Sequence, residues 1–596
     1  MTARAVSRQL TGALLAATIA LFAGRPSVPP TVQAAAPALG SRATLRVGLW
    51  TLWHDRELKL TPGKAATFRT CETCVPRPLA NTATLRAGGN NISFFAGGAP
   101  THSTQILIAG SITLAAHGET VTLHNPLTIN ARNGTLIIAV TLPVENYVER
   151  VVASESSPAD SAESLKALAI VVRTYALHES HGHFGYDLCD TTHCQHLRWS
   201  AAATAPDESA TLATAGETLW FHGHRALAYF SKDCGGQTAS PSEIWPRAVS
   251  ATYLPSRPDP YCARLGSAEW DSELSYADLS AATAAYGLAA TGWEQLIVSR
   301  RAPSGRALAL RLGNTEISAE DFRIAIGESL GWNKVPSTWF EVTRQGDRFL
   351  FHGRGWGHGV GLCQKGAAAM AAQNQTSRDI LSQYFPGAES ADETTGIAWK
   401  TFVGSSLILE TLDAADAAYL PQLERARAEA SQRSGLNASA RFTVRAFAST
   451  SAFRDTTLSP GWIAAFTRGD WIASQPLRTL AARHLLAPTM RHEFLHALIE
   501  RESTSATPLW LREGLAETWG EDRPVYSATI HAPPAPALRS LDNALAHATS
   551  ETESRAAHLA AGWYAARLLE RFGRNQVLAW LRSGVPASAL AVLGQR

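Results

Sequence analysis

Residues Leu142–Trp199 read LPVENYVERVVASESSPADSAESLKALAIVVRTYALHESHGHFGYDLCDTTHCQHLRW. Apolar side chains recur at helical spacing from Val144 to Val152, which predicts a short amphipathic helix. Glu145 and Glu149 fall on the opposite, solvent-facing side of that helix. Glu155 stands where the helix is expected to end, so the apolar stripe does not account for it.

A second helix is expected directly afterwards. Asp160 is the predicted N-cap and Glu163 stands at the third helical position, before an apolar stripe. The loop beyond this helix contains many thiol and imidazole groups: His181, His183, Cys189, His193, Cys194 and His196. From the residues alone, Glu155 is either a solvated helix-end residue or a catalytic carboxylate. The loop is either a metal site or a short disulfide with exposed histidines.

A glycine-rich segment lies further along the chain, where residues 351–367 read FHGRGWGHGVGLCQKGA. Neither a Walker lysine nor a Rossmann strand-turn-helix pattern accompanies these glycines, which argues against a phosphate loop. The segment instead predicts a backbone that comes close to a ligand or to another loop, because glycine lacks a Cβ. Trp356 and His358 would be presented from it.

These motifs together resemble the SpoIID/LytB family of cell-wall proteins. The similarity rests on residues 153–155 (ASE), 172–177 (VRTYAL), 189–195 (CDTTHCQ), 234–238 (CGGQT) with Trp245, and 357–367 (GHGVGLCQKGA). It spans residues 43–388, and it departs from the family pattern at Leu168, where the family usually has Gln.

The resemblance implies a lytic transglycosylase that cuts the glycan strands of peptidoglycan, with Glu155 as acid and base. One carboxylate is sufficient for this reaction, because the 6-hydroxyl of muramic acid takes the place of water. No second carboxylate stands at a compelling position in the sequence. The substrate-binding residues expected for this activity are Arg173, Tyr175, Trp356, His358 and Gln364.

The Cys/His loop is expected to hold a structural Zn²⁺ ion beside the glycan groove. Thiolate and imidazole are ligands that zinc prefers, and the family resemblance favours the metal over a disulfide. Cys189 and Cys194 supply the thiolates. Either His183 or His193 completes the set, and His183 is preferred.

The other cysteines suggest disulfides, because the chain carries an export signal. Cys71 and Cys74 are closely spaced and predict a local disulfide. Cys234 and Cys262 could form a second pair, which would leave Cys363 as a free thiol. The sequence does not fix this connectivity.

The segment before the first helix predicts a β module over residues 43–140. Short runs of Val, Ile, Leu and Thr alternate there with Gly and Asn turns, and Asn133-Gly134 is a hairpin turn signal. The module should lead directly into the helix of Glu155. The catalytic core is then expected over residues 141–388, and residues 389–410, whose start is small and polar, are expected to form a linker.

The C-terminal region, residues 411–596, contains a second set of chemical motifs. In the segment RHEFLHALIE (491–500), His492 and His496 share one helix face and can bind a single Zn²⁺ ion, with Glu493 as general base. PLWLREGLAE (508–517) follows. The two segments resemble the gluzincin metallopeptidases, and the resemblance implies Glu513 as third ligand and Glu517 as the residue that orients a ligand.

Composition and the N-terminus indicate where the protein acts. The 596 residues include 53 Lys+Arg against 51 Asp+Glu, and this balance argues against nucleic acid as a partner. Residues 1–35 predict a signal peptide, with Arg4 and Arg8 before the apolar run Leu10–Phe22 and a cleavage site near Ala34. An uncleaved anchor is the alternative, and no membrane span is expected beyond this segment.

The sequence therefore predicts an α+β protein: a β-rich module, a SpoIID-like α+β domain and a mainly α zinc-peptidase-like domain. The expected protein is exported, and is periplasmic, cell-wall associated or extracellular. Its expected partners are glycan strands, a peptide or protein substrate and a cell-wall amidase. The rival hypothesis is a non-catalytic amidase enhancer that binds the wall and carries the peptidase domain.

Overall fold

The computed structural model describes residues 44–594 except 179–182, 246–247, 249–250, 267, 289–294, 314, 440, 458, 460–461, 505, 521–535, 547 and 549. The chain is mixed α and β, with 38% helix and 28% strand, in agreement with the predicted α+β class. The expected signal peptide, residues 1–35, lies outside the described residues. Within the described part of the chain, no helix combines the length and apolarity needed to cross a membrane.

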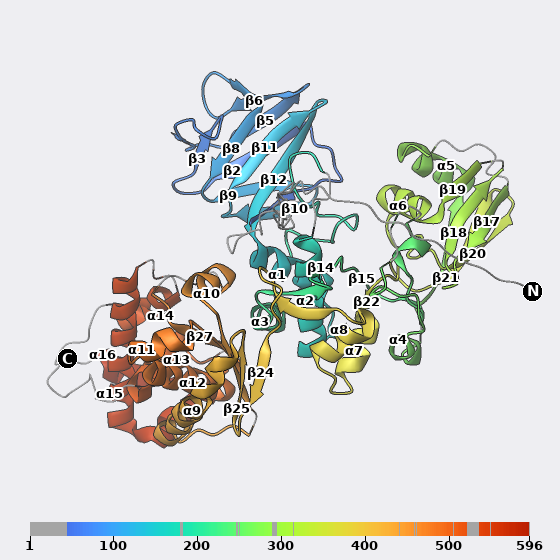
Figure 1. Ribbon diagram of the computed structural model, residues 1–596. Helices are drawn as coiled ribbons and strands as arrows, with labels where there is room; N and C mark the ends of the chain where they lie inside the picture. Colours follow the sequence, from blue (N-terminus) through green and yellow to red (C-terminus); the bar gives the residue numbers. More distant parts are fainter. Residues whose placement is uncertain are drawn as a thin grey trace, which may run out of the picture.

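The N-terminal module consists of two six-stranded sheets (Figure 1, blue). The first has the order β1 (Thr44–Gly48), β12 (Thr135–Pro143), β11 (Leu127–Arg132), β8 (Gln105–Ala109), β3 (Thr67–Arg69) and β4 (Arg77–Pro78). The second has the order β10 (Glu119–Leu123), β9 (Ile112–Ala116), β2 (Glu57–Pro62), β5 (Ala83–Gly88), β6 (Asn91–Phe95) and β7 (Thr101–Ser103). Burial alternates along most strands, so each sheet turns one face toward a shared core.

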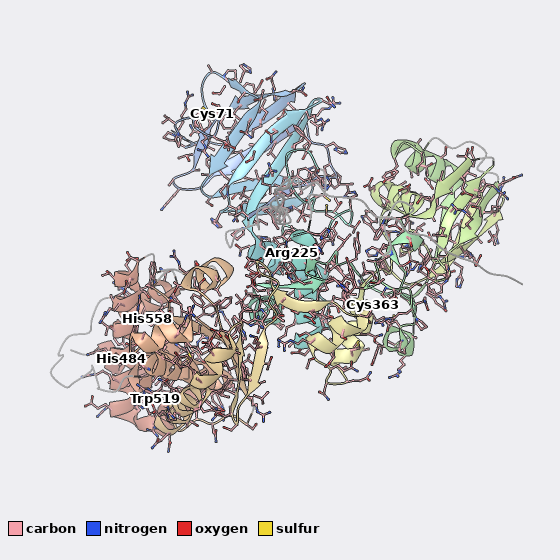
Figure 2. The ribbon with its side chains drawn as sticks, viewed as in Figure 1. Cys71, Arg225, Cys363, His484, Trp519 and His558 are labelled. Carbon is pink, nitrogen blue, oxygen red and sulfur yellow. A yellow bond between two sulfur atoms is a disulfide. The ribbon has the colours of Figure 1, made fainter. Side chains whose placement is uncertain are left out.

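Two local predictions for this module are confirmed. Asn133 and Gly134 both have positive φ, 51° and 80°, and join β11 to β12 with Arg132 paired to Thr135. Cys71 and Cys74 form a disulfide (Figure 2).

The core domain begins where β12 runs directly into a helix. Its helices are α1 (Val144–Glu155), α2 (Ala162–Ala176), α3 (Ala205–Ala213), η1 (Pro241–Glu243), α4 (Pro260–Arg264), α7 (Gln364–Ala371) and α8 (Ser377–Tyr384). One sheet has the order β14 (His224–Arg225), β13 (Glu217–Phe221) and β23 (Glu389–Asp392). β15 (Phe230–Ser231) pairs in parallel with β22 (Leu362–Cys363). The predicted helix pair, with Glu155 at the junction, is therefore present.

Two details of this helix pair differ from the sequence prediction. Glu145 does not face solvent: its carboxylate is buried and pairs with the fully buried Arg173. The second helix is capped by Ser161 rather than Asp160, and Ser164 completes the capping box. Asp160 instead accepts hydrogen bonds from the backbone and hydroxyl of Ser157, in the turn between the helices.

An additional unit is inserted between β15 and β22, within the range expected to be one catalytic core (Figure 1, green). Its elements are β16 (Glu269–Ser275), α5 (Tyr276–Ala285), β17 (Leu296–Arg301), β18 (Ala307–Leu312), β19 (Thr315–Ser318), α6 (Ala319–Leu330), β20 (Phe340–Gln345) and β21 (Arg348–Arg354). They form two three-stranded sheets, β16-β21-β20 and β17-β18-β19, around a hydrophobic core of their own. The sequence does not mark this unit as separate, because its helices and strands alternate like those around it.

The C-terminal region is a five-stranded sheet with helices around it (Figure 1, orange and red). The sheet order is β24 (Lys400–Val403), β25 (Leu407–Thr411), β26 (Phe442–Ala446), β28 (Trp471–Ser474) and β27 (Ala465–Arg468). The helices are η3 (Ala414–Tyr419), α9 (Leu420–Ser434), α10 (Thr450–Thr457), α11 (Leu477–Ala482), α12 (Leu486–Glu502), α13 (Leu509–Gly520), α14 (Leu538–Ala546), α15 (Glu551–Ser583) and α16 (Ala587–Gly594). The region is thus more β-rich than expected, and the range expected as a linker, 389–410, contains β23, β24 and most of β25.

The C-terminal sheet packs against the core domain through a buried ion pair. The Arg445 guanidinium on β26 lies 2.5 Å from the Glu217 carboxylate at the start of β13, and 2.5 Å from Glu410. The Trp399 ring covers Arg445 at 4.7 Å from its centroid. An aromatic cluster with Phe447 extends this contact, so the two regions share a tightly packed joint.

Candidate functional site

Glu155 is the last residue of α1, and the surrounding segments fix its backbone. The Nε2 amide of Gln364, at the start of α7, donates a hydrogen bond to the Glu155 carbonyl at 3.3 Å. The preceding Ser154 is fixed by Arg198, whose backbone N–H donates to the Ser154 hydroxyl at 2.9 Å. The Glu155 side chain keeps 19% of its surface exposed, so its carboxylate is sheltered but reachable.

The surroundings of this carboxylate favour its protonated form. Burial raises the pKa of Glu155 to about 7, and the positive charges of Lys232 and Arg198 oppose that rise. His196 Nδ1 lies 3.9 Å from Glu155 Oε1, and burial and Arg198 lower the pKa of this histidine, which keeps it neutral near pH 7. A carboxyl with a pKa near neutrality can both give and take a proton.

Glu155 opens into a groove with a cavity volume of about 490 Å³. The described residues that line the groove come from the α1–α2 junction, the end of α2, the Cys/His loop, the segment after β14, the inserted unit and the glycine-rich segment. Glu155 is the only carboxylate among them. Aromatic and cationic side chains make up much of the wall: Tyr175, Tyr229, Phe230, Trp332, Trp356, Arg198, Lys232 and Arg323. The Lys232 ammonium lies 5.4 Å from the Trp356 ring centroid.

Three of the five residues expected to bind substrate line this groove: Tyr175, Trp356 and His358. Trp356 is 36% exposed. Burial lowers the pKa of His358 to about 4, so the ring is neutral, and its Nδ1 accepts a hydrogen bond from the Val360 N–H at 3.0 Å. Trp245 packs beside His358, with ring centroids 5.2 Å apart.

The other two expected residues, Arg173 and Gln364, are not part of the groove wall. Arg173 has no exposed surface, and its guanidinium donates to the Glu145 carboxylate and to the Glu217 carbonyl. Gln364 is buried and holds the Glu155 backbone. The expectation that these two residues contact substrate was therefore wrong. A sequence motif can contain residues that support the structure as well as residues that bind a ligand, and the motif alone does not separate the two. Leu168, the departure from the family pattern, is buried in the apolar core.

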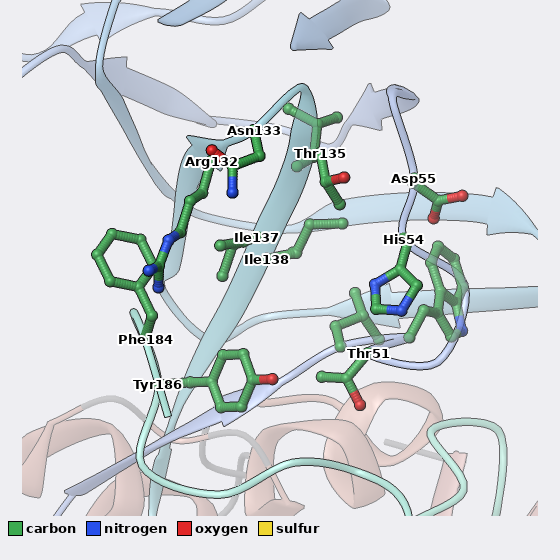
Figure 3. A pocket seen from close by; sticks show the side chains of 13 residues that line it. Thr51, His54, Asp55, Arg132, Asn133, Thr135, Ile137, Ile138, Phe184 and Tyr186 are labelled. Atoms are coloured by element: carbon green, nitrogen blue, oxygen red, sulfur yellow. The ribbon is translucent and has the colours of Figure 1, made fainter. Parts of the chain in front are cut away.

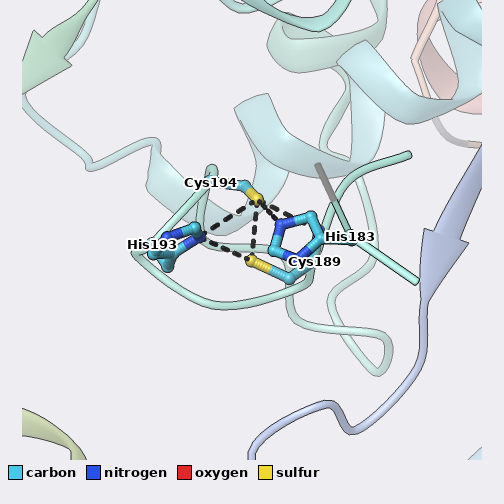
Figure 4. A group of neighbouring side chains, drawn as sticks. All are labelled: His183, Cys189, His193 and Cys194. Atoms are coloured by element: carbon cyan, nitrogen blue, oxygen red, sulfur yellow. Dashed lines mark hydrogen bonds between the residues drawn. The ribbon is translucent and has the colours of Figure 1, made fainter. Parts of the chain in front are cut away.

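The Cys/His loop brings four potential metal ligands together (Figure 4). Cys189 Sγ and Cys194 Sγ are 2.8 Å apart, and His183 Nε2 lies 3.1 Å from Cys194 Sγ. His193 Nδ1 lies 3.8 and 3.7 Å from the two sulfur atoms. Two thiols and two imidazoles match a tetrahedral zinc site. Both histidines converge on the thiols, whereas only one of them was expected, with His183 preferred.

Asp190 ties this loop to the β module. Its carboxylate accepts hydrogen bonds from the backbone N–H groups of Trp50 and Thr51, from the Thr51 hydroxyl and from the Trp199 indole. The module therefore supports the loop that forms one wall of the groove.

A second cavity, of about 300 Å³, lies nearby in the β module (Figure 3). It is lined by apolar β12 side chains such as Ile137, with Arg132 and His54 at its edges and Phe184 and Tyr186 from the loop before Cys189. No catalytic carboxylate pair or thiol lines it among the described residues.

The sequence of the domain that contains this groove is similar to known proteins. Residues 132–221 match the family model SpoIID, described as stage II sporulation protein. An uncharacterized protein of Brachyspira hyodysenteriae is 32% identical over 264 residues, which cover 44% of this chain and 70% of that protein. The chain therefore contains a SpoIID domain.

Two named relatives from Bacillus subtilis are more distant. Stage II sporulation protein D is 26% identical over 275 residues, covering 42% of this chain and 75% of the relative. The protein named amidase enhancer is 24% identical over 288 residues, covering 40% of this chain but only 39% of the relative. Residues 268–361, which contain the inserted unit, match a domain of unknown function, DUF8618. The SpoIID domain thus carries an insertion that contributes Arg323 and Trp332 to its groove.

Outside the SpoIID domain, the C-terminal region brings the predicted metal ligands together. On α12, His492 Nε2 and His496 Nε2 are 3.0 Å apart. Glu513 on α13 approaches, with its Oε2 3.2 Å from His496 Nε2. Burial lowers the pKa of His492 to about 3, so that imidazole is neutral and able to ligate. The donor set fits a zinc ion bound by two histidines and a glutamate.

Further acidic and imidazole side chains surround the three candidate metal ligands. Glu493 is buried, which raises its pKa, and its Oε2 accepts a hydrogen bond from the Thr467 hydroxyl at 2.8 Å on the edge strand β27. Glu517 Oε2 lies 3.9 Å from His492 Nδ1, in the place expected for a ligand-orienting residue. His558 on α15 was missed: its Nε2 lies 3.4 Å from Glu513 Oε2 (Figure 2). No sequence spacing links it to the HExxH helix, so only the packing reveals it.

Proposed function

We propose that the SpoIID domain cleaves peptidoglycan glycan strands as a lytic transglycosylase, with Glu155 as both acid and base. The observation that supports this most is a single sheltered carboxyl, with a pKa of about 7, in a groove lined by aromatic and cationic side chains. Aromatic rings such as Trp356 offer flat faces for sugar rings. Lys232 and Arg198 suit the carboxylates of muramic acid and its peptides.

The proposed reaction needs only one proton shuttle. Protonated Glu155 gives its proton to the glycosidic oxygen as the bond between that oxygen and the muramic acid C1 breaks. The 6-hydroxyl of the same sugar then bonds to C1, and the Glu155 carboxylate takes the hydroxyl proton. The products are a 1,6-anhydromuramic end and a free 4-hydroxyl, with Glu155 returned to its protonated state.

Mass spectrometry of digested peptidoglycan tests this proposal. Wild-type protein and the variants Glu155→Gln and Glu149→Gln are incubated with glycan strands that carry or lack stem peptides. Glu149 is the matched control, because it lies on the same helix but outside the groove. Anhydromuramic ends that vanish only in Glu155→Gln support the proposal. Reducing ends would instead indicate hydrolysis by an additional carboxylate.

The alternative is a wall-binding enhancer of a cell-wall amidase, a class suggested by the name of one relative. Under this alternative the groove binds glycan without cutting it, and an amidase is the partner. Glu155→Gln would then leave the stimulation of amidase-driven wall digestion unchanged, and no anhydromuramic ends would form. Either activity requires an exported protein at the wall, with residues 1–35 as its signal peptide.

We further propose that the C-terminal region is a zinc peptidase that acts on wall peptides or on a protein at the wall. His492, His496 and Glu513 would hold a Zn²⁺ ion, which would supply Lewis-acid polarisation of a peptide carbonyl. Glu493 would take the proton of the attacking water and pass it to the leaving amine. Its sheltered position and its single hydroxyl partner, Thr467, support this role.

Peptide cleavage by Glu493→Gln tests the second activity. We expect this variant to lose hydrolysis of muropeptide stem peptides or of a protein substrate while the glycan reaction continues. Glu502→Gln is the control, since Glu502 lies on the same helix but pairs with Arg582 at its end. Equal peptide cleavage by wild type and Glu493→Gln would refute the assigned role.

A further inference from the structure

Three cysteines and one aspartate converge at a place that the glycan reaction does not use. Cys234 lies in the turn after β15, Cys262 in α4 and Cys363 at the end of β22, while Asp259 caps the start of α4. Their Sγ and carboxylate oxygen atoms all lie within 4.8 Å of one another. All four residues are at most 1% exposed (Figure 2 labels Cys363). The sequence left a Cys234–Cys262 disulfide open, but all three cysteines are free thiols here.

The carboxylate of Asp259 is held with one oxygen toward the sulfur atoms. Its Oδ1 accepts hydrogen bonds from the backbone N–H groups of Tyr261 and Cys262 at 3.1 and 3.0 Å. Its Oδ2 accepts from the Tyr384 hydroxyl at 2.8 Å and lies 3.3 Å from Cys234 Sγ. Hydrogen bonds that orient a carboxylate in this way are typical of the residues around metal ligands.

The backbone also approaches the cluster closely. The Cys234 N–H donates to Cys363 Sγ at 3.3 Å, as backbone amides do toward thiolates. A Cβ atom at Gly366 would lie 2.6 Å from Asp259 Oδ2 and 2.0 Å from the Tyr384 hydroxyl, so only glycine fits there.

A buried cation lies beside the cluster. Arg306 has no exposed surface, and its guanidinium donates to the carbonyls of Cys234 at 2.9 Å and Gly357 at 3.2 Å. Among the described residues, no carboxylate forms an ion pair with it. The negative groups near this guanidinium are Glu320, which pairs with Arg323, and the cluster itself. Thiolates at the cluster would therefore add to the stabilisation of this buried charge.

We propose that Cys234, Cys262, Cys363 and Asp259 bind a Zn²⁺ ion in a structural site. Four ligands with three thiolates are typical of closed zinc sites, and tetrahedral zinc holds its sulfur ligands about 3.8 Å apart for a Zn–S bond of about 2.3 Å. An iron–sulfur cluster distributes its thiolates over two or more irons and needs a wider spread of the sulfur atoms. A disulfide would use only two of the three sulfur atoms. It would leave the third thiol and the buried Asp259 carboxylate without a common partner, whereas a metal ion would bind all four groups.

The proposed ion would stabilise the segments that support the groove without lining the groove itself. It joins the turn after β15, α4 and the β22–α7 connection, which are far apart in the sequence. Cys363 directly precedes Gln364, whose amide holds the Glu155 carbonyl. Loss of the ion should therefore loosen the position of Glu155 without removing any group from the groove. The metal assignment itself does not depend on what reaction occurs there.

Metal analysis of a full-length variant tests the site directly. In the variant Cys189→Ser/Cys194→Ser/His492→Ala/His496→Ala, the other two candidate zinc sites are disabled. We expect this variant to retain one equivalent of Zn²⁺ and, after exchange with Co²⁺, to show thiolate-to-cobalt charge-transfer absorption. Adding Cys262→Ser should abolish both signals. A folded fourfold variant without bound metal would overturn the proposal.

Alkylation of the wild-type protein provides a test that does not require any variant to fold. Iodoacetamide is applied without reductant, before and after EDTA, and the modified cysteines are mapped by mass spectrometry. The proposal expects Cys234, Cys262 and Cys363 to be protected before EDTA and modified after it. A peptide pair linked through any two of them would show a disulfide, and unchanged protection after EDTA would show burial alone; either result contradicts the metal site.

Discussion

The Gln364 side-chain amide donates a hydrogen bond to the Glu155 backbone carbonyl at 3.3 Å, across 209 residues of sequence. This bond connects the two strongest motifs of the SpoIID domain, the ASE tripeptide and the GHGVGLCQ segment. The end of α1, where the carboxylate is presented, is thereby fixed from the start of α7. Gln364 is a positioning residue, because its side chain contacts the backbone of Glu155 and does not line the groove.

Replacement of Gln364 by Ala should slow glycan cleavage without weakening glycan binding. Loss of one hydrogen bond costs about 1 kcal/mol, which corresponds to a decrease in kcat of about fivefold. Steady-state kinetics on a defined glycan oligomer measures kcat and KM separately. Gln373→Ala is the control, since the side-chain amide of Gln373 donates to the local carbonyl of Ala369 near the end of α7. A rise in KM with unchanged kcat would point to substrate contact instead.

The pH dependence of cleavage should reflect the raised pKa of Glu155. The acid must be protonated to give its proton, so kcat/KM should fall as the pH rises above about 7. Lys232 and Arg198 both lower this pKa. Lys232→Met should therefore move the descending limb to higher pH, because removal of a positive charge favours the neutral carboxyl. A limb that stays in place in this variant would argue against Glu155 as the titrating group.

Removal of a ligand from the Cys/His loop should release one metal ion. We expect Cys194→Ser to lose one equivalent of zinc by elemental analysis and to lower the Tm. Ligand replacement should weaken zinc binding at least about 100-fold, since loss of an orienting neighbour alone costs 10–100-fold. His183→Ala and His193→Ala should each weaken binding if both rings ligate, because both reach the two sulfur atoms. An effect of only one replacement would identify a three-residue site.

The insertion should contribute to substrate binding through Trp332. This side chain lines the groove and packs on Arg323, whose guanidinium carbon lies 5.6 Å from the ring centroid. Loss of an aromatic contact of about 1 kcal/mol should raise KM about fivefold. Trp53→Ala serves as control, because Trp53 is 56% exposed and lies in the β module outside the groove. Equal KM values for both variants would exclude the insertion from glycan recognition.

The joint between the core and the C-terminal region should depend strongly on Arg445. Arg445→Ala leaves Glu217 buried without its partner, which should lower the free energy of unfolding by about 3–5 kcal/mol. Denaturant unfolding, followed by fluorescence, measures this loss. Replacement of the exposed pair member Arg300, which contacts Glu316 at the surface, should cost at most about 1 kcal/mol. Similar losses in both variants would show that the joint is not a cooperative unit.

The sequence by itself determined those features that depend on neighbouring residues. Helical periodicity placed Glu155 at a helix end, the Asn133-Gly134 pair marked a hairpin, and the i, i+4 spacing put His492 and His496 on one face of α12. The resemblance to the SpoIID family rested on such short motifs, and the family match confirms it. Local backbone preferences and side-chain spacing act over a few residues, so they can be read along the chain.

Only the tertiary structure decided which distant residues meet. It buried Glu145 against Arg173 and turned Gln364 from an expected substrate ligand into a support for Glu155. It also added His558 to the HExxH site and gathered three thiols around Asp259. These contacts join segments separated by long stretches of chain. They arise because packing forces buried charges and polar groups to find partners wherever the fold brings them, and no local pattern records that choice.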